Sequence, residues 1–180
     1  EEAGWTDADG DGVRDKEGQS LTLQAYLMGW GYLPEVGQML QAQFQAVGVK
    51  LELQTVAFPA AVEAAGQSKH HLAPRTYSSS DPSVLNLPYL SSNAASGFNW
   101  SKIRDAQLDQ LLNDGVRTLE PGQRASLYAQ AQPRIMDLAL ILPIREYVNL
   151  NGAKIAVQGL QYDRRGWFPW LHDVWVSDKK

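Results

Sequence analysis

The stretch SLTLQAYLMGWGYLPEVGQMLQAQFQAVGVKLELQT, residues 20–55, decides the fold class. Apolar and polar residues alternate from Ser20 and again from Val49, which is typical of half-buried strands. Between these segments Pro34 suits the first turn of a helix, and Gly48 suits its end. Apolar residues recur there at spacings of three and four, at Val36, Met39, Leu40, Phe44 and Val47. Short connections between strand, helix and strand predict a βαβ unit with parallel strands.

Outside this unit, the sequence pattern predicts three more helices and two extended segments. Helices are expected over residues 58–67, 103–116 and 121–138, and Pro133 is expected to kink the last of them. Extended structure is expected over 70–77 and 140–150, where prolines restrict pairing to a sheet edge. We therefore expect an α/β fold with a mixed, mainly parallel sheet flanked by helices, formed by residues 1–180 as a single domain.

Composition excludes several classes of partner. The 180 residues carry 16 Lys and Arg against 20 Asp and Glu, a net charge of -4, which argues against nucleic-acid binding. No apolar run approaches the roughly 20 residues of a membrane-spanning helix. The absence of cysteine excludes disulfides and thiol chemistry. Because the chain begins at Glu1, without an initiating Met or an apolar leader, we expect a processed or truncated piece of a longer protein.

A run of aspartates near the N-terminus has the first half of a calcium-loop pattern. Asp7, Asp9 and Asp11 alternate and are followed by Gly12, a spacing that lets carboxylates converge on one hard cation. The bidentate glutamate of such a loop would fall at position 18, which is Gly18. We therefore predict a turn that closes a hairpin, and the alternative is weak or structural calcium binding at these aspartates.

Residues 77–81, which we call loop 77–81, form the candidate ligand-binding loop. The loop follows an expected extended segment and consists of Tyr77, Ser78, Ser79, Ser80 and Asp81. Neutral hydroxyls orient a ligand without demanding a counter-charge. For Asp81 the alternative is that its carboxylate caps a short helix that begins at Pro82.

Sequence motifs of catalysis are missing. There is no Gly-x-Ser-x-Gly turn, no His-Glu-x-x-His pair and no phosphate-binding glycine loop, so we expect neither an enzyme nor a catalytic residue. His70 and His71 point to opposite faces of an extended segment, and we expect them to face solvent or to make hydrogen bonds. Four aromatic residues near the C-terminus are expected to fill packing gaps or, alternatively, to stack on sugars: Trp167, Phe168, Trp170 and Trp175.

Several short motifs, taken in order, resemble the second half of the family 5 extracellular solute-binding proteins, which are the dipeptide, oligopeptide and nickel receptors of ABC importers. These motifs span nearly the whole chain. They lie at residues 2–5, 7–14, 34–36, 48–54, 80–83, 109–112, 120–124, 128–132, 142–144 and 173–175.

The resemblance implies a function in solute uptake. The chain would be the C-terminal lobe of a periplasmic-binding-protein-like (type II) clamp, and its partners would be the N-terminal lobe of the same protein, a peptide-like or other small solute, and an ABC permease. It implies a periplasmic or extracellular location, with anchoring at the cell surface as a further option, and no cofactor. The alternative from another class is a stand-alone calcium- or carbohydrate-binding module.

The sequence also departs from the resembled family at the candidate loop. In dipeptide-binding relatives an Asp lies three residues before the Asp-Pro pair and receives the ammonium group of the ligand, and that position here is Ser78. The preceding strand of the family is an apolar run that ends in Gly-Trp, whereas residues 71–77 here read HLAPRTY. The resemblance therefore implies an altered pocket wall and a solute that this lobe does not hold by its ammonium group.

Overall fold

The computed structural model describes residues 2–95, 98–146, 148–164 and 166–178. The chain divides into two compact units, residues 1–76 and 77–180. The expectation of one domain over 1–180 stays a prediction. Within the described residues, no helix has both the length and the apolar character needed to cross a membrane.

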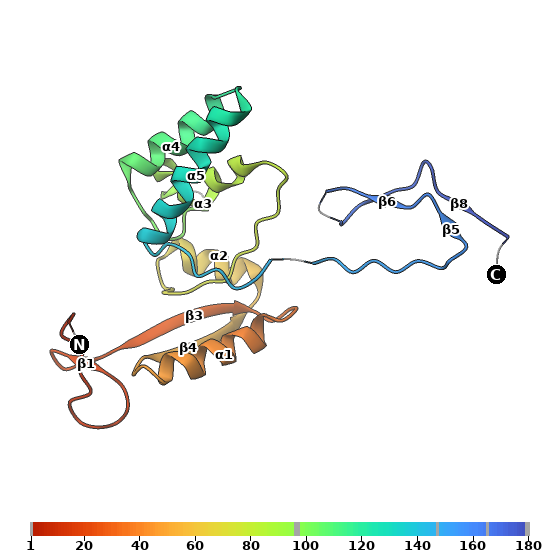
Figure 1. Ribbon diagram of the computed structural model, residues 1–180. Helices are drawn as coiled ribbons and strands as arrows, with labels where there is room; N and C mark the ends of the chain where they lie inside the picture. The colour runs from red at the N-terminus through yellow and green to blue at the C-terminus, as the bar shows by residue number, and fades with distance from the viewer. Residues whose placement is uncertain (1, 96–97, 147, 165, 179–180) are drawn as a thin grey trace. The chain divides into compact units, whose positions relative to one another are not determined.

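The first unit is built on the βαβ arrangement that the sequence predicts. Strand β3 (Thr22–Met28), helix α1 (Leu33–Gln45) and strand β4 (Lys50–Val56) follow one another, as Figure 1 shows. The strands are parallel and paired from Thr22 opposite Lys50 to Met28 opposite Val56. Alternation therefore puts one set of β3 side chains against α1, and the prediction of a parallel βαβ unit is confirmed.

The core of the first unit lies between this sheet and α1. Its buried members are Ala25, Leu27 and Leu51, and Leu40 and Phe44 of α1 pack against them. The predicted inward face of the helix was wrong at two positions. Met39 is 63% exposed and Val47 is 56% exposed.

Gly37 explains why the helix face differs from the predicted one. It is buried in α1, and a Cβ added there would clash with Cδ1 of Leu27. The helix therefore approaches β3 closely through a residue without a side chain, and Leu40 and Phe44 continue that face at helical spacing. Met39 lies off this face, and Val47 lies beyond the end of α1.

Helix α2 (Phe58–Gly66) confirms the short alanine-rich helix and buries Ala61, Ala64 and Ala65. The predicted extended segment over 70–77 makes only one isolated parallel bridge, between Ala25 and Leu72. Pro74 has no N–H to continue that pairing, so the prediction of a strand here was wrong.

The second unit begins with short helical turns and continues with two packed helices. The turns are η1 (Pro82–Leu85), α3 (Asn86–Tyr89) and η2 (Ser91–Asn93). Helix α4 (Ala106–Arg117) packs against α5 (Pro121–Asp137), which contains Pro133. The predicted helices are thus present, although α4 begins three residues later than expected because Asp105 caps it by accepting from the N–H of Leu108 at 2.8 Å.

The core of the second unit lies between α4, α5 and α3. Leu108, Leu112, Tyr128, Ala131, Ile135 and Tyr89 are its buried members. At the contact between the two long helices, a Cβ added to Gly115 would lie 2.9 Å from the Tyr128 ring. A glycine on α4 therefore makes room for an aromatic side chain on α5.

The described residues of the C-terminal segment of this unit include four two-residue strands. Strand β5 (Val157–Gln158) pairs with β8 (Trp175–Val176), and β6 (Gln161–Tyr162) pairs with β7 (Pro169–Trp170), both antiparallel. The described residues of 140–150 form neither a helix nor a strand, so the segment expected to be extended pairs with no sheet there. Pro143 interrupts any ladder there.

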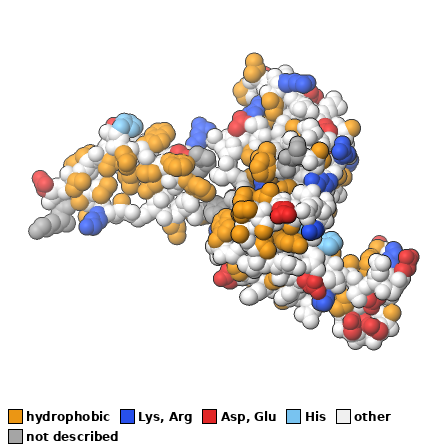
Figure 2. Space-filling model, turned by 180° about the vertical axis from the view of Figure 1, so that it is seen from behind, with side chains coloured by type: hydrophobic (Ala, Val, Ile, Leu, Met, Phe, Trp, Pro, Cys, Tyr) orange, Lys and Arg blue, Asp and Glu red, His pale blue; other side chains and the backbone are white. Residues whose placement is uncertain are grey.

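Apolar side chains along this C-terminal segment are largely exposed, and they gather on the left of Figure 2. They include Val148, Leu150, Ile155, Trp167, Phe168, Trp170, Leu171, Trp175 and Val176. A contiguous apolar surface on a soluble domain commonly marks an interaction site.

Candidate functional site

Loop 77–81 opens the second unit, and its serines are accessible. Ser78, Ser79 and Ser80 are exposed, whereas Tyr77 and Asp81 are half-buried. The Ser79 hydroxyl oxygen accepts a hydrogen bond from the N–H of Asp81 at 3.1 Å. The structure thus presents a row of three serines to solvent between two better-buried ends.

Asp81 is held from two directions. Its Oδ1 accepts from the N–H of Ser83 at 2.8 Å, which caps η1, and from Nη2 of Arg124 at 2.7 Å. The hydrogen bond from Arg124 holds the pKa of the Asp81 carboxyl well below its usual range, and the Ser83 bond adds to this effect. The alternative in which Asp81 caps a helix at Pro82 is confirmed.

Arg124 was not identified from the sequence, and it links three parts of the second unit. Besides Asp81, its Nε donates to the carbonyl oxygen of Gly115 at 2.9 Å. Its guanidinium lies 5.2 Å from the ring centroid of Tyr128, within the range of a cation–π contact. The hydrogen bond to the Asp81 carboxylate raises the pKa of Arg124, so this side chain stays charged.

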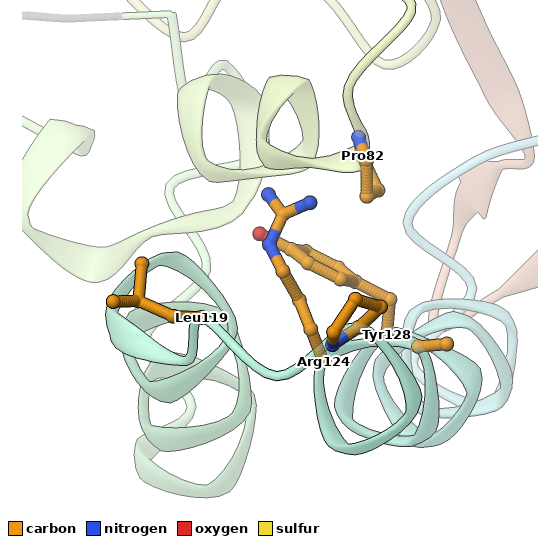
Figure 3. Close-up of a pocket in the computed structure, with 6 residues that line it drawn as sticks. Pro82, Leu119, Arg124 and Tyr128 are labelled. Atoms are coloured by element: carbon orange, nitrogen blue, oxygen red, sulfur yellow. The ribbon is translucent and has the colours of Figure 1, made fainter.

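A pocket of about 280 Å³ lies beside this ion pair (Figure 3). Arg124 and Tyr128 form its polar side, and apolar residues supply the rest: Pro82, Leu119, Pro121 and Ala125. None of the residues 77–80 lines it. The pocket is therefore separate from the predicted loop, although it shares the arginine that holds Asp81.

The other end of loop 77–81 is Tyr77, which is half-buried. Burial raises the pKa of Tyr89, a buried core residue of α3, to about 12, and Tyr77 makes a smaller contribution in the same direction.

A second candidate surface lies at the carboxyl ends of the parallel strands in the first unit. It was not predicted from the sequence. Trp30 follows β3 and is 54% exposed, and Phe58 follows β4 and is 48% exposed. Ligands of open parallel sheets bind beyond the carboxyl ends of their strands. The signal was available in the sequence, since each aromatic residue comes within a few positions of the end of a predicted strand.

The aspartates near the N-terminus converge as the calcium-loop pattern predicts. One carboxylate oxygen from each of Asp7, Asp9, Asp11 and Asp15 lies within 4.8 Å of the others. Asp15, which was missed, is the ninth residue counted from Asp7, a position that contributes to calcium loops. These four residues could hold a hard cation.

The same residues also form the predicted turn. Thr6 and Asp15 make an isolated antiparallel bridge that closes the loop containing Asp7, Asp9 and Asp11. Asp15 continues into strand β1 (Asp15–Lys16), which pairs antiparallel with β2 (Gln19–Ser20). The Asp7 carboxylate accepts from the N–H groups of Gly10 and Gly12 at 2.8 and 3.0 Å. The turn is therefore closed by its own hydrogen bonds, and calcium binding stays a prediction.

We predict that calcium binds this loop only weakly, because Gly18 supplies no bidentate ligand. At a calcium concentration equal to Kd the free energy of unfolding rises by about 0.4 kcal/mol. That corresponds to an increase in Tm of about 1–2 °C for a chain of this length. Thermal melts with and without millimolar calcium, repeated with Asp7→Asn, measure the shift. A rise above about 10 °C in the parent chain alone would contradict weak binding.

The histidines take the expected structural role in part. Nδ1 of His71 accepts a hydrogen bond from the N–H of Gln24 at 2.9 Å, and the His71 N–H donates to the Gln24 carbonyl at 2.9 Å. His71 therefore satisfies backbone groups at the edge of β3, as predicted for a hydrogen-bonded histidine.

Comparison with known proteins identifies the relatives of this chain. No protein-family model matches it. The chain is 30% identical over 137 residues to the probable di/tripeptide-binding protein 5 of Pseudomonas aeruginosa (strain UCBPP-PA14). The match covers 74% of this chain and 26% of that protein. The chain is homologous to the family 5 solute-binding proteins. The family resemblance drawn from the sequence motifs is confirmed.

Solved structures of solute-binding proteins share the fold. The oligopeptide-binding protein AppA from Bacillus subtilis, in complex with a nonapeptide, superposes with a TM-score of 0.72 at 20% identity, over 98% of this chain and 36% of that chain. The ABC transporter-associated periplasmic binding protein DppA from Helicobacter pylori, in complex with the peptide STSA, gives 0.58 at 19% identity, over 63% and 23% of the two chains.

The chain therefore has the α/β fold of the type II periplasmic-binding-protein class, as predicted. Its longest strand pair is parallel and carries helices, and its other strand pairs are short and antiparallel. The chain spans about a quarter of the length of the di/tripeptide-binding relative.

Proposed function

We propose that this chain is the C-terminal lobe of a substrate-binding component of an ABC importer. It captures a peptide-like or other small solute together with an N-terminal lobe, and the closed protein delivers the solute to a permease. The observation that carries this proposal is the 30% identity to a di/tripeptide-binding protein over 137 residues. Ligand contacts to both lobes would stabilise the closed state relative to the open one.

Loop 77–81 is the proposed solute-binding element of the second unit. Its three exposed serines are free of charge, so they suit polar groups such as peptide N–H and C=O. Because Ser78 has no carboxylate, this lobe does not bind the ammonium group of a peptide by a charge-assisted bond.

Trp30 and Phe58 are the proposed solute-facing residues of the first unit. Each is about half-exposed just beyond the carboxyl end of a parallel strand. Large aromatic side chains at such an edge offer apolar area and stacking to side chains of a solute.

The exposed apolar C-terminal segment supports an N-terminal lobe as partner. Several aromatic and branched side chains of residues 148–176 are exposed, although burial of such groups is strongly favourable. In AppA, 64% of the chain lies outside the match (100% less the 36% covered), enough to supply a covering lobe.

We further propose a periplasmic or extracellular location and a role without chemistry. The relatives are solute-binding proteins, and the match to a periplasmic binding protein supports the location. A stand-alone sugar-binding module is the alternative, and quenching of the exposed Trp167 and Trp170 by sugars would favour it.

Installing a carboxylate at Ser78 tests the assignment of loop 77–81. In the two-lobed protein, Ser78→Asp should raise the affinity for trialanine relative to N-acetyl-trialanine by about tenfold or more. The reason is that a hydrogen bond between charged groups contributes about 1.5–3 kcal/mol. Calorimetry with both peptides measures the ratio.

Ser92→Asp is the matched control for that experiment, because Ser92 is exposed in the same unit and lies outside the loop. The control should leave the ratio unchanged. An unchanged ratio in Ser78→Asp as well would remove Ser78 from the solute site.

A further inference from the structure

Loop 77–81 has its two ends fixed differently. Tyr77 is half-buried, and Asp81 accepts hydrogen bonds from Ser83 and Arg124. The serines between them make one described contact, from the Asp81 N–H to Oγ of Ser79 at 3.1 Å. The conformation of the serine row therefore depends on how firmly Asp81 is held.

Arg124 connects Asp81 to the helical core. It extends from α5 across 43 positions of sequence to Asp81, and its Nε binds the carbonyl of Gly115 in α4 at 2.9 Å. The Tyr128 ring lies under the guanidinium. Only 25% of the Arg124 side chain is exposed, so its position is fixed by packing as well as by charge.

We propose that Arg124 is the positioning residue of the solute-binding loop. It orders Ser78, Ser79 and Ser80 by fixing Asp81 against α4 and α5, and it touches no solute itself. The inference rests on the proposed function, in which these serines contact the solute. It adds that the affinity of the loop is set by an arginine outside it.

The planar fork of arginine is needed for this role. Nη2 and Nε donate at the same time to a carboxylate of one element and a carbonyl of another. Lysine offers one compact charge and does not reproduce two directed bonds from a planar group. Arg124→Lys should therefore restore only part of the order that Arg124→Met removes.

Arg134 provides a matched control on the same helix. Its Nη2 binds Oδ2 of Asp105 at 2.6 Å, and Asp105 caps α4 as Asp81 caps η1. The bond from Arg134 lowers the pKa of Asp105, as the bond from Arg124 does for Asp81. Arg134→Met thus breaks an equivalent Arg–Asp pair whose described bonds do not reach loop 77–81.

Nitrogen-15 relaxation of the Ser78, Ser79 and Ser80 amides in the whole chain tests the proposal. We expect order parameters of about 0.8 in the parent chain and in Arg134→Met, and values below about 0.6 in Arg124→Met. If Arg124→Met fails to fold, Arg124→Lys and Asp81→Asn serve instead, and each should lower the same order parameters. The double variant Arg124→Lys/Asp81→Asn should lower them no further than the stronger single variant, because both changes break one link.

Unchanged order in all Arg124 and Asp81 variants would overturn the proposal, as would equal loosening in Arg134→Met. A trialanine titration followed by amide shifts then separates this inference from the proposed function. Shifts at residues 77–81 that need at least about fivefold more trialanine in Arg124→Met support both. Shifts that occur only elsewhere would refute the role of the loop in binding, while the relaxation data would still support Arg124 as its anchor.

Discussion

Replacing Asn99 by leucine should destabilise the second unit by about 2–4 kcal/mol. Asn99 is completely buried, and its Nδ2 donates to the carbonyls of Leu90 and Ile103, both at 3.0 Å. Its Oδ1 accepts from the hydroxyl of Ser101 at 2.9 Å. Leucine has the same branched arrangement of heavy atoms but is bulkier and makes none of these bonds, so it leaves polar groups unpaired around a buried side chain.

Urea unfolding followed by far-UV circular dichroism measures this loss. Asn113→Leu is the control, because Asn113 is exposed on α4 and its replacement should change stability by less than about 0.5 kcal/mol. A loss of unfolding free energy for Asn99→Leu no larger than that of the control would show that the buried amide does not stabilise the second unit.

Local pattern predicted the βαβ unit, because alternation over 20–26 and 49–55 and helical spacing over 34–47 are each set by neighbours in sequence. The exact helix face was not predictable in this way. It depends on Gly37 lying against Leu27 of the neighbouring strand, and an apolar pattern that counts side chains overlooks a glycine contact. Met39 and Val47 were assigned inward for that reason.

The segments expected to be extended do not form strands, and the reason is a different one. Residues 70–77 and 140–150 have strand-like composition, but a strand needs a partner along its length, and the single bridge at Leu72 is followed by Pro74. Partner availability is a tertiary property that a local pattern does not carry.

The candidate sites were predictable only where the residues are close in sequence. Asp7, Asp9 and Asp11 were found by alternation, whereas Asp15 joins them through the bridge to Thr6. Arg124 was not predicted as a site residue because it lies 43 positions from Asp81 in sequence and contacts it only in the folded chain. Long-range polar pairs of this kind have no local signature.

The isolated chain should bind its solute at least about a hundredfold more weakly than the two-lobed protein. A tight small-molecule site buries roughly 70–90% of the surface of its ligand, and one lobe supplies one wall of such a site. The exposed serines of loop 77–81 are hydrated in that open wall, so each hydrogen bond to the solute yields little net free energy. Loss of about two net hydrogen bonds, at about 1.4 kcal/mol each, corresponds to about a hundredfold in Kd.

The chain should nevertheless fold without the other lobe. Each compact unit has a core of its own, centred on Ala25, Leu27 and Leu51 in the first and on Leu108 and Leu112 in the second. A weak affinity would then reflect missing contacts rather than missing structure, and circular dichroism of the same sample checks this point.

The most direct measurement of the lobe assignment is calorimetry on both proteins with one solute. The solute is the compound that mass spectrometry finds bound to the purified two-lobed protein. The account predicts tight binding to the two-lobed protein and a Kd at least about a hundredfold higher for the folded 180-residue chain. Comparable affinity in the isolated chain would contradict the assignment of this chain as one lobe of a clamp.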